Sequence, residues 1–208
     1  MRVKWMQTAL VAIGLAVGGG AARAQTDIAA SLYGAFSQST SGNNTTQSPS
    51  NATGGLLELR HISNPLVGYE VTYSYNRANQ AYSAASLASS ASIPANAHEV
   101  TGDWVVSLKA ASFRPFAVAG GGVLFHVPTS GQATISTTNS IASLATSTST
   151  QGVFVYGAGL DWTVLPHLGL RFQYRGNLYK APDLTKVFTS TGAFTHTAEP
   201  MIGIFFRL

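Results

Sequence analysis

The chain has 208 residues, enough for one ordinary domain. Only 10% of the residues are charged and 45% are hydrophobic, so the composition fits neither a typical soluble domain, with about 25% charged residues, nor a segment kept disordered by its charge. The formal charge of +4 and the sequence pI of about 9.5 do not predict a nucleic-acid partner, because Arg2, Lys4 and Arg23 lie in the first 24 residues and the remainder is close to neutral.

The first 24 residues have the pattern of a secretory signal peptide. Arg2 and Lys4 form a basic start, residues 9–17 are apolar, and small residues lead to Ala24, after which we expect cleavage. The alternative is a membrane-spanning helix, which needs about 20 apolar residues, and this stretch ends at the glycines of residues 18–20. We therefore predict a signal peptide over residues 1–24 and an exported domain over residues 25–208, without cysteine and so without disulfide bonds.

The exported part alternates between apolar and polar residues with a period of two. In residues 168–179, for example, Leu170 and Phe172 alternate with Arg171 and Gln173, which is typical of a β-strand with one apolar face. The same pattern predicts eight strands, each about as long as the 9 to 11 residues that cross a bilayer. The predicted strands are residues 28–37, 54–62, 66–77, 98–109, 114–126, 151–163, 167–179 and 195–208.

Short and long connections alternate between these strands. Barrels of outer membranes show this alternation, with short periplasmic turns and long outer loops. The long connections are rich in serine and threonine, so we expect exposed and mobile loops. The short turns are residues 63–65, 110–113 and 164–166, and the long loops are residues 38–53, 78–97, 127–150 and 180–194.

The sequence therefore predicts an all-β fold, an eight-stranded antiparallel up-and-down transmembrane β-barrel. A soluble β-sandwich or a lipocalin-like barrel is the alternative with the same number of strands. A soluble barrel places its charges outside, whereas here Glu70, for example, lies opposite an apolar face formed by Val67, Tyr69 and Val71. Because lipid does not solvate charge, we expect the polar face to line the lumen.

Aromatic residues on the apolar face are predicted to form belts at the two membrane interfaces. The predicted outer belt contains Tyr73, Tyr75, Phe154 and Tyr156. Trp162 and Phe206 are predicted to lie toward the periplasmic end.

Three segments of the second half resemble a known family. Residues 157–175 (GAGLDWTVLPHLGLRFQYR), 114–125 (RPFAVAGGGVLF) and 202–208 (IGIFFRL) are similar to strands of the outer-membrane β-barrel domain family, the relatives of the transmembrane domain of outer-membrane protein A. The resemblance implies an eight-stranded barrel in the cell outer membrane of a Gram-negative-type bacterium. It also implies a C-terminal signal that the barrel-assembly machinery recognises. In this family the signal usually ends on an aromatic residue. Here the signal would comprise Ile204, Phe206 and a final Leu208.

The interior of an eight-stranded barrel is just wide enough for side chains to fill it. Buried charges need partners, so we interpret the charged residues of the polar face as a salt-bridged network that fills the lumen. A charged plug that gates a narrow ion path is the alternative. The predicted network has five acids and five bases: Glu58, Arg60, Glu70, Asp103, Lys109, Asp161, Arg171, Arg175, Glu199 and Arg207.

We expect no catalytic, cofactor-binding or metal-binding residues. The five histidines are far apart in the sequence and lack the spacing of metal ligands. Some eight-stranded outer-membrane barrels modify lipid A, and His126 with Ser130 is a pair close in sequence at a loop edge, but no acid lies near it on that hairpin. We therefore predict that the protein is not an enzyme and uses no cofactor.

These observations together predict an integral outer-membrane protein with a structural or surface-interaction role. A low-conductance pore is the first alternative and a lipid A-modifying enzyme is the second. The expected partners are outer-membrane lipid, the barrel-assembly machinery during insertion, and an extracellular ligand at the Ser/Thr-rich loops, with no nucleic acid.

Overall fold

The computed structural model describes residues 25–63, 66–84, 89–136, 141–185 and 189–208. The predicted signal peptide over residues 1–24 lies outside these residues. The described part of the chain consists of β-strands and their connections, and it contains no helix with the length and apolar character needed to cross a membrane.

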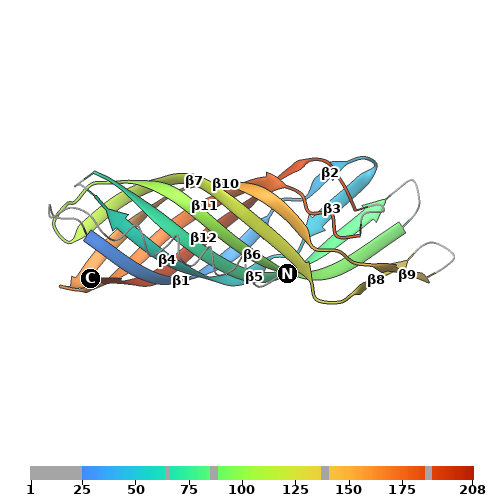
Figure 1. Ribbon diagram of the computed structural model, residues 1–208, viewed down its shortest axis with the longest axis horizontal. Coiled ribbons are helices and arrows are strands. Elements are labelled where there is room, and N and C mark those ends of the chain that lie inside the picture. The colour runs from blue at the N-terminus through green and yellow to red at the C-terminus, as the bar shows by residue number, and fades with distance from the viewer. Residues whose placement is uncertain (1–24, 64–65, 85–88, 137–140, 186–188) are drawn as a thin grey trace, which may run out of the picture.

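Eight long strands form a closed antiparallel barrel whose strands are tilted against its long axis (Figure 1). Each long strand pairs with the next one along the chain, and β1 pairs with β12 from Asp27 and Arg207 to Ser37 and Thr197, which closes the ring. The predicted all-β, eight-stranded fold is therefore confirmed. The strands are β1 (Gln25–Ser37), β4 (Ala52–Ile62), β5 (Val67–Ala84), β6 (Ser89–Ser107), β7 (Phe113–Pro128), β10 (Ser149–Leu165), β11 (Leu168–Lys180) and β12 (Phe194–Arg207).

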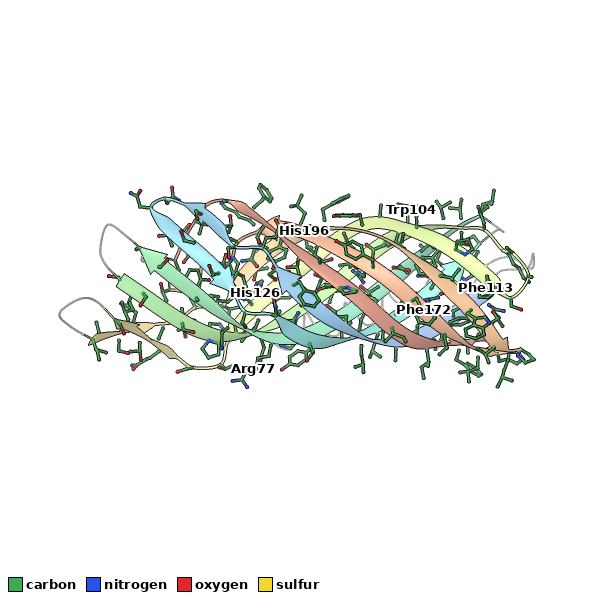
Figure 2. All side chains as sticks on the ribbon, turned by 180° about the vertical axis from the view of Figure 1, so that it is seen from behind. Arg77, Trp104, Phe113, His126, Phe172 and His196 are labelled. Carbon is green, nitrogen blue, oxygen red and sulfur yellow. The ribbon has the colours of Figure 1, made fainter. Side chains whose placement is uncertain are left out.

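The wall of the barrel is apolar outside and polar inside. Leu57 and Trp104 are exposed, whereas Arg60 and Arg171 are completely buried. Figure 2 shows Trp104 and Phe113 projecting away from the wall. A soluble barrel has the opposite distribution, so the soluble alternative is excluded. Closure also pairs every long strand on both sides, which leaves the barrel without an open edge.

The two ends of the barrel differ in their connections. The short turns after β4, β6 and β10 lie at the same end as the C-terminus, where the Leu208 amide donates to the Thr26 carbonyl oxygen over 2.9 Å. We call this the turn end. The opposite end, which we call the loop end, carries the long connections (Figure 1).

The long connections contain more strand than the sequence predicted. The predicted loop over residues 78–97 is wrong, because β5 and β6 remain paired as far as Ala84 and Ser89. Four short strands flank this hairpin, since β3 pairs with β5 and β8 pairs with β6. They are β2 (Thr40–Gly42), β3 (Thr45–Pro49), β8 (Gln132–Ser136) and β9 (Ile141–Ala145). We call these four strands, with β5 and β6 beyond the Arg77–Asn96 pair, the outer extension.

The outer extension has a local core and a tight turn of its own. Tyr82 and Ile93 pack with Ala133 and Leu184, and the Tyr82 hydroxyl donates to the Pro182 carbonyl oxygen over 2.8 Å. The turn between β2 and β3 has Asn43 and Asn44 at φ values of 50° and 57°. Positive φ at both central positions fits a type I′ hairpin turn, which asparagine tolerates well.

Candidate functional site

The lumen contains a cluster of ion pairs around Arg60 on β4. The Arg60 Nε atom donates to Glu70 Oε2 over 2.8 Å and lies 2.9 Å from Glu58 Oε1. Its Nη1 atom is 3.5 Å from Asp161 Oδ2, across the barrel on β10. All four side chains are buried, so this one guanidinium balances carboxylates from three strands in the barrel interior.

Arg171 on β11 belongs to the same cluster. Its Nε and Nη2 atoms donate to the two oxygens of Asp161 over 2.6 and 2.8 Å, which is the bidentate geometry of strong Arg–carboxylate pairs. Its Nη1 atom also donates to Glu58. We call Arg60, Arg171 and their three carboxylates the central cluster.

Two phenylalanine rings fill the space beside the central cluster. The Cζ atom of Arg60 lies 3.9 Å from the centroid of the Phe116 ring, and that of Arg171 lies 5.4 Å from the centroids of both Phe116 and Phe205. A guanidinium at these distances from an aromatic ring gains cation–π attraction. The Cζ atom of Arg207 is 5.7 Å from the Phe205 centroid. Charges and rings together occupy this level of the lumen.

Arg175 on β11 forms a second cluster nearer the loop end. Its Nη2 atom lies 3.3 Å from Glu99 Oε1 and 3.8 Å from Asp103 Oδ2, both on β6. Glu199 on β12 is the cross-strand neighbour of Arg175. The Asn177 amide nitrogen donates to Glu99 Oε2 over 3.0 Å. We call Arg175, Glu99, Asp103 and Glu199 the upper cluster, in which three acids surround one base.

A third cluster lies at the turn end. The Asp27 carboxylate is 3.5 Å from Arg207 Nε and 3.9 Å from Arg114 Nη1. Gln25 joins it, because its amide nitrogen donates to Asp27 over 2.7 Å and its amide oxygen accepts from Arg114 over 2.6 Å. This cluster lies where β1, β7 and β12 reach the turn end.

The structure places most of the predicted network residues inside the barrel and one of them outside. Arg207 is half-buried, and the prediction for Lys109 is wrong, since β6 ends at Ser107 and Lys109 is exposed in the following turn. The apolar–polar alternation of β6 continues for two residues into that turn and therefore does not mark the end of the strand. The other eight predicted residues are buried: Glu58, Arg60, Glu70, Asp103, Asp161, Arg171, Arg175 and Glu199.

Three further charged residues of the lumen were not in the predicted network. Asp27 lies one residue before the predicted first strand, which actually begins at Gln25. Glu99 and Arg114 follow the same inward alternation as Thr101 and Phe116, and this alternation could have identified both. With these additions seven acids and five arginines face the interior, so the lumen has an excess of carboxylates.

The predicted aromatic belts lie on the outer wall, together with histidines that sequence reasoning did not assign to them. The six predicted belt residues are between 41% and 52% exposed. The Tyr73 hydroxyl is 2.9 Å from His98 Nδ1, and the Tyr156 hydroxyl is 2.9 Å from His196 Nε2. Such amphipathic rings suit a boundary between apolar and polar surroundings.

The candidate pair for lipid A chemistry is not assembled. His126 is buried on the lumen side, where its Nδ1 atom lies 3.2 Å from Gln151 Oε1. Ser130 is exposed in the following loop, and its hydroxyl accepts from the Gln132 amide over 3.3 Å. In the described ranges, no group of three His, Asp or Glu side chains has a metal-binding arrangement.

The sequence matches no protein-family model and no curated protein. Its structure, however, matches solved structures over nearly the whole chain. Ail, the attachment invasion locus protein of Yersinia pestis, solved in complex with the heparin analogue sucrose octasulfate, matches with a TM-score of 0.53 and 15% identity, over 90% of this chain and 100% of Ail. The chain has the fold of an eight-stranded outer-membrane β-barrel.

Two further solved structures of this fold match equally broadly. Neisserial surface protein A matches with a TM-score of 0.52 and 13% identity, over 89% of this chain and 99% of that chain. The outer membrane protein OprG from Pseudomonas aeruginosa matches with a TM-score of 0.51 and 11% identity, over 88% and 96% of the two chains. This is the fold implied by the resemblance of residues 114–125, 157–175 and 202–208.

Proposed function

We propose that the protein is an integral outer-membrane barrel with a filled lumen, whose role is structural or surface-interacting and is neither enzymatic nor that of a pore. The observation that carries this proposal is the central cluster. Two buried arginines, three buried carboxylates and the rings of Phe116 and Phe205 occupy the interior at one level. The network acts as a core that replaces water.

Conductance across a planar lipid bilayer tests this proposal against the pore. The purified barrel is expected to give no discrete channels at neutral pH, because an ion would have to displace the guanidinium groups of Arg60 and Arg171. The variant Phe116→Ala opens space beside Arg60, and its conductance is compared with that of the unmodified protein. Discrete channels in the unmodified protein would reject the filled-lumen proposal in favour of the low-conductance pore.

Membrane insertion is supported by the apolar outer wall between the two aromatic belts. The partner of this wall is outer-membrane lipid, reached after export and removal of the predicted signal peptide. A folded barrel in detergent is expected to migrate faster on a gel before boiling than after it. A monomer that stays soluble without detergent would contradict the proposal.

The barrel-assembly machinery is the proposed partner during insertion. Ile204, Phe206 and Leu208 all point outward at the end of β12, with between 50% and 67% of each side chain exposed. Phe206→Ala is expected to lower the amount of assembled barrel in the outer membrane, whereas Leu208→Phe is expected to maintain or raise it. Equal assembly of the two variants would argue against this signal.

The outer extension is the proposed interaction surface. Residues 38–53, 78–97 and 127–150 contain no Asp, Glu, Lys or Arg and are dominated by Ser, Thr, Asn and Ala. Such a surface offers hydroxyl and amide hydrogen bonds but no cluster of bases for a sulfated ligand like that bound by Ail. We therefore propose an uncharged ligand.

Binding of whole cells to immobilised ligands tests this surface. Cells that display the barrel are expected to adhere to neutral glycans better than to heparin. Replacement of residues 132–145 by a short turn is expected to remove this adhesion while the barrel stays folded. Unchanged adhesion, or preferential adhesion to heparin, would reject the outer extension as a neutral binding surface.

Mass spectra of lipid A from the same cells are expected to show no added or missing acyl chain.

A further inference from the structure

A small cavity lies in the lumen between the upper cluster and the outer extension. Its volume is about 30 Å³, and its lining includes Glu99 on β6, His126 on β7, Asn177 on β11, and Thr197 and Glu199 on β12. A cavity needs only about 10 to 15 Å³ to hold one water-sized particle. Figure 2 places His126 in the half of the barrel that carries the loop end.

Two oxygen atoms of the cavity lining lack hydrogen-bond partners. They are Glu199 Oε2 and Asn177 Oδ1, and both residues are only 2% exposed. A buried polar atom without a partner costs free energy, so such atoms in native proteins usually have one. Since both are acceptors, the missing partner must bring positive charge or protons.

The charge around the cavity favours a cation. Arg175 is the base beside Glu99, Asp103 and Glu199, and its Nη2 atom is directed at Glu99 and Asp103. The Asn177 amide nitrogen is also directed at Glu99, which leaves the Asn177 oxygen free. His126 is turned to Gln151, with 3.2 Å between Nδ1 and Oε1.

We propose that this cavity is a binding site for a hard divalent cation, with Ca²⁺ as the ion that it fits best. Carboxylate and amide oxygens are the ligands that Ca²⁺ takes, in flexible geometry and together with water. Glu199 and Asn177 supply the unpartnered oxygens, and Glu99 on β6, whose two oxygens face Arg175 and the Asn177 amide nitrogen, supplies a second carboxylate. Thr197, whose hydroxyl lies 2.7 Å from Ser37 Oγ and 2.9 Å from the Tyr179 hydroxyl, holds the β12 side of the site in place.

A bound cation would join β6, β11 and β12 just below the outer extension. It would compensate the excess of carboxylates in the upper cluster, which the central cluster cannot do from its own level. The site would thus couple the stability of the loop end to divalent cations outside the cell. It does not depend on which ligand the outer extension binds.

The test uses the folded barrel in detergent after removal of metal with a chelator. Calorimetric titration with CaCl₂ is expected to show one ion bound per chain, and millimolar CaCl₂ is expected to raise the unfolding temperature more than NaCl of the same ionic strength. Glu199→Gln is expected to weaken Ca²⁺ binding by about tenfold or more. Glu70→Gln removes the same charge from the central cluster and is expected to keep the Ca²⁺ response.

The direct titration of the unmodified protein decides the proposal even if a variant does not fold. Absence of Ca²⁺ binding, with no rise in unfolding temperature, would show that the cavity holds only water or protons and would overturn the proposal. Equal responses to NaCl and CaCl₂ would overturn the divalent assignment. Binding that is unchanged in Glu199→Gln would show that the ion lies elsewhere.

Discussion

The lumen and the outer extension are formed partly by the same two strands, β5 and β6, but they are stabilised differently. Inside the barrel, Glu70 is held by Arg60 on the neighbouring strand β4, and Glu99 is held by Arg175 on β11, across the lumen. In the outer extension, Tyr82 and Ile93 pack on small residues and on Leu184. One continuous hairpin thus passes from a charged interior to an uncharged one. Ion pairs compensate the buried charges of the lumen, whereas the extension is built around uncharged side chains.

This difference predicts that substitutions in the lumen destabilise the whole barrel, whereas substitutions in the outer extension act locally. The largest effect is expected for Arg171→Ala. This change leaves Glu58 and Asp161 without a major partner, and loss of one member of a buried ion pair costs about 3 to 5 kcal/mol. The unfolding temperature in detergent, read from gel migration after stepwise heating, is expected to fall clearly. An unchanged temperature would contradict the role of the central cluster.

Tyr82→Ala is expected to have a similar but local cost. Removal of a large buried ring typically costs about 3 kcal/mol or more, and here the loss affects the contacts of Tyr82 with Ile93 and Leu184. Limited proteolysis is expected to cleave the outer extension much faster, while gel migration of the barrel stays heat-modifiable. A barrel that unfolds as a whole would show that lumen and extension form one cooperative unit.

A smaller effect is expected at alkaline pH. Burial and the nearby Asp183 carboxylate raise the pKa of Tyr82 above its ordinary value. Because the folded-state pKa is the higher one, this contribution to stability is complete below the unfolded-state pKa of 10.0 and is lost as pH rises toward the folded-state value. Protease sensitivity of the extension should therefore rise at strongly alkaline pH.

Tyr82→Phe is the matched control for the alkaline effect. It removes the ionisable hydroxyl and the hydrogen bond to Pro182, at a cost of about 1 kcal/mol, and it keeps the ring. The part of the alkaline sensitivity that comes from Tyr82 should disappear in this variant. If the two proteins respond identically to pH, Tyr82 does not control the opening of the extension.

The smallest effect is expected for Lys109→Ala. Lys109 is exposed in the turn after β6 and does not take part in the lumen clusters. The free energy of unfolding should therefore change by less than about 0.5 kcal/mol. The unfolding temperature should accordingly stay close to that of the unmodified protein. A large loss of stability would show that Lys109 belongs to the lumen network, as the sequence predicted.

The sequence predicted the barrel well where large residues alternate with polar ones. The contrast between Phe172 and Arg171, or between Tyr69 and Glu70, marks the two faces of a strand without ambiguity. Beyond Arg77 this contrast disappears, because the outward-facing Ala81 and Ser83 are small and the inward face holds both Gln80 and the aromatic Tyr82. The strands continue there, but the alternation has too little hydropathy difference to reveal them, so the outer extension was predicted as loops.

The lumen residues were predictable one by one, but their grouping was not. Strand alternation indicates that Arg60 and Asp161 point inward, yet they lie on β4 and β10, and only the tilt and closure of the barrel bring them together. The cavity beside Glu199 likewise depends on side chains from several strands. The errors at Asp27 and Lys109 arose at strand ends, where two residues decide whether a side chain belongs to the barrel.

The inward placement of the acids separates the total charge of the protein from the charge that its surroundings meet. Seven of the eight acidic residues point into the lumen, and the remaining one, Asp183, is half-buried. The described bases Arg77, Lys109 and Lys180 are exposed. A chain that is nearly neutral beyond residue 24 therefore presents a basic exterior. In mild neutral detergent the folded protein should be retained by a cation-exchange resin at neutral pH, more strongly than its composition indicates.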